Sequence, residues 1–253
     1  AIGTARPALA LGALAAPLEP GPVGLFDRAN SLVVALSNVA MTLESIGDAA
    51  LLAGGNRAMV GGELLQFSTA ESLGGGLWRL TGLLRGLAGT DDAMAHGAGE
   101  PFVLLDDAAL WLLTDDMARQ AESGEASVEW ARRGGIELVD VPVPSAARAL
   151  RPLSPVHGYV RAAADGAIEA RWVRRSRADH GWRDQVDLPI GEGRELWQVM
   201  LVPAVPGHGP WDCTESRLVL DAALLAAIPA GSALSVRQVG DFGLSPPLLL
   251  PLA

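Results

Sequence analysis

The sequence predicts a mainly β protein, in which an antiparallel meander or barrel-like unit is followed by a β-sandwich. Three features lead to this prediction. Residues 55–90 hold short apolar runs separated by glycines, residues 141–155 contain four prolines, and strand-like runs recur after residue 155. The composition agrees, because 49% of the residues are hydrophobic and 30 Gly and 17 Pro supply turns. Such a composition is typical of a folded, turn-rich chain.

The first predicted unit covers residues 23–143. Residues 1–22 are rich in Pro, Ala and Gly, and we expect a linker or an edge strand that continues from a preceding domain. The missing initiator Met adds the expectation that the chain is a fragment of something longer. In residues 31–46 the apolar side chains change face near Asn38, which predicts extended chain with a bulge or turn there. Asp48 is placed to cap a helical turn that Gly54 ends.

Glycines between apolar runs predict β-hairpins at the centre of this unit. Residues 57–60, 63–68 and 77–81 are runs of strand length. Gly61-Gly62 is a two-residue hairpin signal, because the favoured turns need positive φ, and the glycines at 74–76 join the next two runs in a similar way. Further along, Thr90 is placed to cap a short turn. Residues 102–105 predict another strand, and residues 128–131 and 136–139 predict a hairpin.

Residues 141–155 are the best predicted domain boundary, because X-Pro steps break regular structure. The second unit, residues 150–253, predicts a β-sandwich with strands at 158–162, 168–176, 195–202, 217–220 and 234–239. Asp165-Gly166 marks the first hairpin. Trp172 and the ending SALSVRQVGDFGLSPP resemble a fibronectin type III module. The likeness departs at Ala233 and Leu234, which stand where such modules usually carry a corner tyrosine.

Charge argues against a nucleic-acid partner. The net charge is −10, and all 19 basic residues are Arg, for which a GC-rich coding sequence is the simplest reason. Residues 1–148 hold 9 Arg and 18 acidic residues, whereas residues 149–253 hold 10 and 11. An acidic chain repels a polyanion. The basic run at residues 171–177 favours a core Trp172 flanked by solvated arginines, with contact to nucleic acid or an anionic glycan as the alternative.

No motif of a known catalytic class is present, so the sequence predicts no enzyme, no catalytic residues and no cofactor. Acidic pairs at 91–92, 106–107 and 115–116 fall where strands end or turns begin, which favours turn capping over a metal or catalytic pair. The four histidines stand singly, without a second ligand at zinc spacing, so no metal site is expected. The lone Cys213 is predicted to be a small, partly buried hydrophobe. No apolar stretch reaches the length of a membrane span.

Tryptophans supply the candidate contact residues. Those in strand-like runs are predicted to pack in the core or between domains, and they are Trp78, Trp111, Trp130, Trp172 and Trp197. Trp182 and Trp211 lie instead in polar loops that contain Gly or Pro. Exposed loop tryptophans are common anchors for partners. The candidate contacts to a partner or a glycan are therefore Trp182, Trp211, Arg174 and Arg183. The alternative for the two tryptophans is that they cover the edge of the sandwich as lids.

Several segments together resemble one family. They read GGNRAMVGGELLQF, WRLTGLLRGLAGT, GEPFVLLD, ALRPLSPVH, IEARWVRRSR and LSVRQVG, and they span most of residues 48–243. Their order and spacing resemble the C-terminal part of the large tail-tip protein of gene transfer agents and related siphophages, which is called the megatron or baseplate hub.

This resemblance implies a virion structural protein at the tail tip of a phage-like particle that is assembled in the bacterial cytoplasm. It implies other tail or baseplate proteins as partners, a trimer in the full-length assembly, and host attachment at the particle tip. The alternative function is a glycan- or receptor-binding module. A cell-wall glycosidase fragment is less favoured, because the barrel-like upstream domain that the resemblance implies for this family has no match in the sequence.

Overall fold

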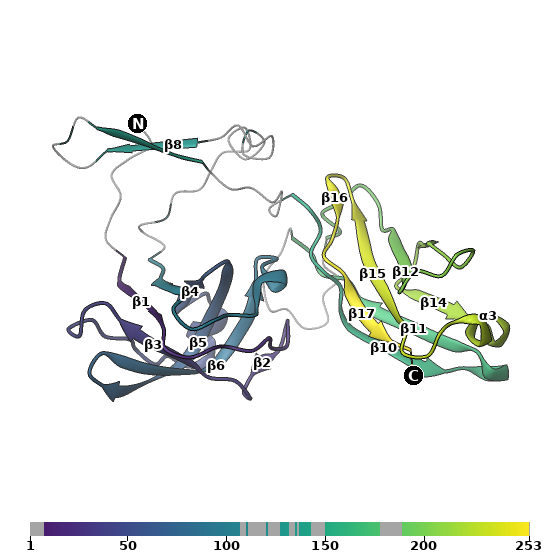
Figure 1. The fold of residues 1–253 in the computed structure, drawn as a ribbon, viewed down its shortest axis with the longest axis horizontal. Coiled ribbons are helices and arrows are strands. Elements are labelled where there is room, and N and C mark those ends of the chain that lie inside the picture. Colours follow the sequence, from purple (N-terminus) through teal and green to yellow (C-terminus); the bar gives the residue numbers. More distant parts are fainter. Residues whose placement is uncertain are drawn as a thin grey trace.

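The computed structural model describes residues 8–106, 110, 120, 127–131, 135, 137–142, 150–177 and 189–252. These residues are mainly β, and the predicted fold class is confirmed (Figure 1). A seven-stranded antiparallel sheet forms the first body, a two-sheet sandwich forms the last, and one separate hairpin lies between them in the sequence. Among the described strands, none of the first body pairs with one of the sandwich. None of the described helices is long and apolar enough to cross a membrane.

The first body is a closed barrel. Six strands follow one another around the wall in the order β6-β3-β1-β7-β4-β5, and β5 pairs back with β6, so every edge is closed. The short β2 adds to β6. The bounds are β1 Ala10–Leu14, β2 Phe26–Asp27, β3 Leu32–Leu36, β4 Arg57–Val60, β5 Glu63–Gly74, β6 Leu77–Leu87 and β7 Pro101–Leu104.

Strand β1 corrects the expectation for residues 1–22. Residues Ala10–Leu14 pair with β3 on one side and with β7 on the other. This segment is therefore part of the barrel wall and is neither a linker nor an edge strand. Its partner in β7 lies far along the chain, since Ala10 pairs with Leu104.

The glycine turns lie where the sequence places them. Gly61-Gly62 joins β4 to β5, and Gly75-Gly76 joins β5 to β6. Gly75 and Gly76 have φ of +61° and +82°, and Gly61 has +52°, a region that glycine adopts without the strain of a side chain. Strand β4 has the predicted bounds. Strands β5 and β6 run on to 12 and 11 residues, because they pair with each other well beyond the apolar runs.

Two local expectations in the barrel need adjustment. The predicted helical turn is α1, Asp48–Leu52, but Asp48 lies in its first turn and the N-cap is Gly47, with no side-chain cap hydrogen bond. The predicted extended segment ends early, because β3 stops at residue 36 and the Asn38 side chain accepts a hydrogen bond from the Ala40 N–H at 2.9 Å. The change of face near Asn38 is a turn.

Inward-facing side chains fill the barrel, as alternation along its strands requires. The fully buried members include Leu32, Val34, Phe67, Leu80 and Phe102. Trp78 packs against this cluster and is partly buried. The barrel therefore has an apolar core of its own.

The last body is a sandwich of a three-stranded and a five-stranded sheet. One sheet has the order β10-β11-β14, with bounds Val156–Ala162, Ile168–Val173 and Arg217–Leu220. The other places β12, Trp197–Val202, between β13, Trp211–Cys213, and β15, Ala233–Gly240. β16, Gly243–Leu244, and β17, Leu248–Pro251, pair with β15. The turn η3, Ala164–Gly166, and the helix α3, Ala222–Ala227, complete the fibronectin type III-like sandwich.

The sandwich core confirms the prediction for two tryptophans. Trp172 and Trp197 are 3% and 0% exposed, and their rings meet edge to face with centroids 5.7 Å apart. Strands β13 and β17 and helix α3 were not predicted, because they are short or lie beside prolines, whereas β16 lies within the ending that resembles the last two strands of a fibronectin type III module. Trp130 is 52% exposed, so the expectation of core packing is wrong for it. Trp111 lies outside the described residues.

The predicted hairpin after the barrel is formed by β8, Ser127–Ala131, and β9, Leu138–Pro142. These two strands pair with each other and, within the described residues, with no other strand. Figure 1 draws them apart from both bodies. At the predicted boundary, β9 ends at residue 142 and β10 begins at residue 156, and residues 143–149 lie outside the described part.

Candidate functional site

The outer face of the β10–β11–β14 sheet gathers arginines. Alternation along β11 turns Trp172 toward the core, so Glu169 and Arg171 point outward. The strand register then aligns two rows of outward side chains. The first row holds Arg161, Glu169 and Val219, and the second holds Tyr159, Arg171 and Arg217.

Glu169 is nearly buried beneath three guanidinium groups. Its Oε1 accepts hydrogen bonds from Arg171 Nε at 3.0 Å and Arg217 Nε at 2.5 Å, and its Oε2 accepts one from Arg161 Nε at 2.7 Å. Hydrogen bonds from Arg171, Arg161 and Arg217 outweigh the opposing effect of burial and lower the pKa of Glu169 from 4.5 to about 2. The side chains of Arg161, Arg171 and Arg217 stay 58%, 44% and 48% exposed. Their charge therefore faces solvent.

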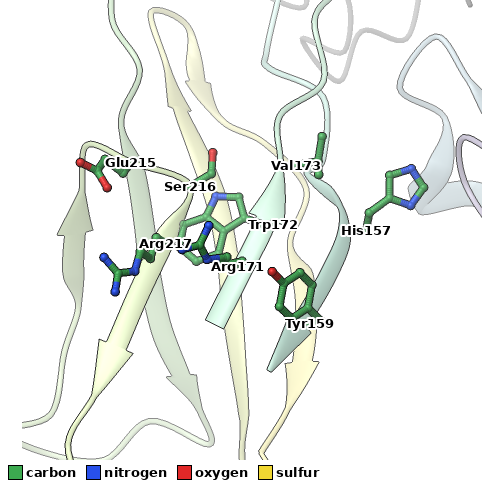
Figure 2. Close-up of a pocket in the computed structure, with 8 residues that line it drawn as sticks. All are labelled: His157, Tyr159, Arg171, Trp172, Val173, Glu215, Ser216 and Arg217. Carbon is green, nitrogen blue, oxygen red and sulfur yellow. The ribbon is translucent and has the colours of Figure 1, made fainter. Parts of the chain in front are cut away.

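A hollow of about 370 Å³ lies beside the second row (Figure 2). The residues that line it are His157, Tyr159, Arg171, Trp172, Val173, Glu215, Ser216 and Arg217. Figure 2 shows Arg171 between Arg217 and Tyr159, and His157 pointing away from them. The hollow thus combines two guanidinium groups with an aromatic ring.

A β-bulge shapes one end of the hollow. The register of β10 against β11 shifts between Val156 and Tyr159, so His157 and Gly158 together face a single residue of β11. His157 has a φ of +50°, which is uncommon outside glycine. Gly158 packs so closely on β17 that a Cβ atom would collide with the Leu250 side chain. The bulge turns His157 away from the arginine rows.

The sequence-predicted contact residues lie elsewhere. Trp182 and Arg183 are outside the described residues. Trp211 lies on β13, in the other sheet of the sandwich, and is half-buried against the core, so its placement in a loop is wrong. Arg174 follows β11 and donates a hydrogen bond to the Pro189 carbonyl at 3.1 Å. Whether these residues contact a partner stays a prediction.

Sequence reasoning did not single out Arg161, Tyr159 or Arg217. Each lies on β10 or β14, and the pairing that brings them to Arg171 joins segments far apart in the sequence. One usable signal was present, because alternation in the 171–177 run predicted that Arg171 points outward. The cross-strand partners then depend on register, which the sequence does not show.

A second polar cluster is buried in the barrel. Arg85 on β6 donates to both carboxylate oxygens of Glu63 on β5, at 2.8 and 2.9 Å, and both side chains are 0% exposed. Arg85 also donates to the carbonyls of Met94 and Glu19, at 2.7 and 3.0 Å. Asp27 lies 3.5 Å from its Nη1. A buried guanidinium with this many partners serves to brace the wall.

His96 joins this cluster by bridging two carboxylates. Its Nε2 lies 2.7 Å from Glu63 Oε2, and its Nδ1 lies 2.8 Å from Glu100 Oε2. Both ring nitrogens of His96 therefore lie within hydrogen-bond distance of a carboxylate. The hydrogen bond from His96, followed by that from the Gly97 N–H, lowers the pKa of Glu100.

This convergence of acids and an imidazole is not open to a substrate. The side chains of His96 and Glu63 are 1% and 0% exposed. Within the described ranges, no group of three or more His, Cys, Asp or Glu side chains is arranged to hold a metal ion. The arrangement fits a structural role.

Acidic residues of the barrel also reach the sandwich. The pair Asp91 and Asp92 lies in the first turn of η1, Asp91–Ala93, where the sequence placed a turn. Asp92 Oδ2 lies 2.8 Å from Arg151 Nη2, and Asp91 Oδ1 lies 3.4 Å from Arg175 Nη1. The residues 107 and 115–116 of the other acidic pairs lie outside the described part of the chain.

Together these features define a two-body β protein with a buried ionic cluster in the barrel and an exposed arginine face on the sandwich. A family model described as "Rcc01698-like, C-terminal" matches residues 9–103, the segment that forms the barrel. No curated protein matches the chain.

Three solved structures with similarity to the chain are multi-domain fragments. Domains d3–d4 of the rat CD45 extracellular region share 11% identity, with 59% of this chain and 71% of that chain covered and a TM-score of 0.29. Domains FN1–FN3 of chicken CNTN1 share 12%, with 92% and 65% covered and a TM-score of 0.26. Domains A168–A170 of titin share 12%, with 96% and 98% covered and a TM-score of 0.27.

Proposed function

We propose that the chain is a structural component of a phage-like tail tip, of the baseplate-hub type found in gene transfer agents. The family-model match over residues 9–103 and the wider sequence resemblance support this function. In this proposal the chain assembles with other tail proteins, and the full-length protein forms a trimer. The closed barrel with its buried ionic cluster is a rigid unit suited to such a scaffold.

The observation that carries the proposal is the exposed apolar face of the β8–β9 hairpin. Val128 pairs with Val141 and Trp130 pairs with Val139, so these four apolar side chains share one face. Trp130 is 52% exposed, and Val139 and Val141 are exposed as well. An isolated two-stranded hairpin is marginal in water, and such a face marks a contact site.

The opposite face of the hairpin indicates the kind of partner. Glu129 pairs directly with Asp140, and both are exposed. These two acidic groups lie on the face opposite the apolar strip, so the hairpin fits a partner that covers the strip with an apolar surface and leaves the acidic face in solvent. A neighbouring tail protein with such a surface is the occupant that we propose.

Particle purification tests this function. The chain is tagged within its full-length protein, particles are isolated from the encoding strain, and the tag is located by immunoblotting and immunogold microscopy. We expect the tag in the particle fraction, at the tail tip. Its absence from purified particles would refute the tail-tip function.

Two hairpin variants test whether the hairpin is the contact surface, independently of the tail-tip function. Trp130→Glu places a charge on the apolar face and should lower incorporation into particles severalfold. Leu138→Glu places the same charge on the acidic face, where Leu138 is 64% exposed, and should leave incorporation unchanged. If both variants incorporate equally, the hairpin is not the contact surface, although the tail-tip function stands.

A second candidate function is contact with a glycan or receptor of the host. The arginine face of the sandwich favours it, because three exposed guanidinium groups gather there in a chain of net charge −10. Whole-cell binding by the isolated chain tests this candidate. Equal binding to cells with and without surface polysaccharide would count against it.

A further inference from the structure

We infer that the outer face of the β10–β11–β14 sheet binds a saccharide that carries a carboxylate or phosphate group, at the hollow beside Tyr159, Arg171 and Arg217. This proposal specifies the site and the ligand class for the second candidate function, contact with a host glycan or receptor, and it rests on that function. Binding is measured with the isolated chain, so its outcome does not depend on the tail-tip function.

The arginine face carries an excess of positive charge. Arg161, Arg171 and Arg217 surround the single carboxylate of Glu169, which leaves the cluster with two positive charges in excess. Glu215, which is exposed, lines the hollow as well and reduces this excess. With Glu215 counted, one positive charge remains in excess, so the hollow attracts an anionic group at short range within a chain that is acidic as a whole.

The three arginines also supply hydrogen-bond donors for a ligand. A guanidinium has five N–H donors in a planar fork, and Glu169 engages at most two of them on any one of the three arginines. The other N–H groups of these arginines have no acceptor within the described part of the chain. Paired N–H groups of a guanidinium match the two oxygens of a carboxylate or phosphate.

The guanidinium groups are preorganised for an anion. Glu169 is held on a sheet strand and fixes the Arg171 and Arg217 head groups through hydrogen bonds at 3.0 and 2.5 Å. Because Glu169 has a pKa of about 2, it stays charged at every pH at which a saccharide carboxylate is charged. Less side-chain entropy is then lost when an anion binds.

Apolar groups beside the arginines fit the ring of a saccharide. Tyr159 is 46% exposed beside Arg171, and Val173 is 49% exposed at the same hollow. An aromatic ring and an apolar side chain next to paired cations suit the flat C–H face of a sugar that carries an acidic group. The hollow of about 370 Å³ has the size of a small-ligand site. A long polyanion fits less well, because the net charge of −10 repels it.

Isothermal titration calorimetry at low ionic strength tests the inference with the isolated chain. The probes are trigalacturonate for a carboxylate, glucose 6-phosphate for a phosphate, maltotriose as the neutral trisaccharide, and a short single-stranded oligonucleotide. We expect trigalacturonate or glucose 6-phosphate to bind, and added salt to weaken the binding. We expect maltotriose and the oligonucleotide to bind at least about tenfold more weakly.

Three variants locate the site. Arg217→Ala should weaken binding about tenfold, because it removes a charged donor pair. Tyr159→Ala should weaken it severalfold without touching the contacts of Glu169. Glu215→Gln should strengthen it about two- to threefold, because it removes the opposing charge. Arg79→Ala is the control, since Arg79 is an exposed barrel arginine paired with Glu71.

The outcomes decide the inference as follows. Equal binding of trigalacturonate and maltotriose would overturn it, as would equal binding by the Arg217→Ala and Arg79→Ala variants. If Arg217→Ala unfolds, weaker binding by Tyr159→Ala and tighter binding by Glu215→Gln still support the site, and no change in either overturns it. If the oligonucleotide binds more tightly than both saccharides, the ligand is a nucleic acid and the inference is wrong.

Discussion

Replacing Arg85 by Met should destabilise the barrel strongly. The guanidinium is fully buried and donates two hydrogen bonds to Glu63 and one each to the carbonyls of Met94 and Glu19. After the substitution, the carboxylate of Glu63 keeps only His96 and a backbone N–H as partners. Removing one partner of a buried ion pair costs about 3–5 kcal/mol, because the other charge stays buried without compensation.

We therefore expect Arg85→Met to lower the free energy of unfolding by about 4 kcal/mol, which is a large part of the total stability of a small domain. In a domain of this size the midpoint of thermal unfolding should fall by about 15 °C or more. Urea unfolding followed by circular dichroism measures the first quantity, and a thermal melt measures the second.

The matched control is Arg79→Met on the same strand. Arg79 pairs with Glu71 at 3.0 Å, but the two side chains are 44% and 59% exposed. Exposed pairs contribute less than about 1 kcal/mol. A combined Arg85→Met, Glu63→Met variant should lose less than the sum of the single losses, because both buried charges are gone. Equal losses for Arg85→Met and Arg79→Met would refute the reasoning.

Three further results follow from the structure. Because the folded pKa of Glu169 is about 2 and its ordinary value is 4.5, its stabilisation is complete above pH 4.5 and is lost as the pH falls toward 2. The difference in unfolding free energy between the native chain and Glu169→Gln should shrink over that range, and parallel pH profiles would contradict this. Gly75→Ala should lower the free energy of unfolding by about 1 kcal/mol, because the φ of Gly75 is +61°. Gly62→Ala should leave it almost unchanged in the same urea assay, because Gly62 has no positive φ. Equal losses for the two variants would show that backbone strain is not the cause. Arg175→Glu faces Asp91 with a like charge and should increase the radius of gyration in X-ray scattering, so an unchanged radius would mean that this contact does not hold the barrel to the sandwich.

The parts of the fold that the sequence predicts well are those that depend on neighbouring residues. Gly61-Gly62 and Gly75-Gly76 mark their hairpins because positive φ is a local requirement. Alternation placed Trp172 in the core and Arg171 outside for the same reason. The bounds of β4 and β14 match the predicted runs, since each is a short apolar stretch between turns.

The parts that escaped prediction depend on distant pairing. Strand β1 looks like a linker in the sequence, and it becomes a wall strand only because residues near position 104 close the barrel. Glu63 looks like an ordinary turn residue beside two glycines, yet Arg85 and His96 bury it. The partners of Arg171 on the sandwich face follow from register alone.

The two bodies use arginine in opposite ways, and this separates the two proposals. In the barrel, Arg85 is buried and fully engaged by carboxylates and carbonyls, so its charge holds the wall together and reaches no ligand. On the sandwich, one nearly buried carboxylate holds three arginines whose charge faces outward. Assembly through the Trp130 face and anion binding through Arg217 therefore lie on different surfaces. Trp130→Glu should reduce particle incorporation without changing saccharide affinity. Arg217→Ala should weaken saccharide binding without changing particle incorporation. If either variant impaired both properties, the two surfaces would not be independent.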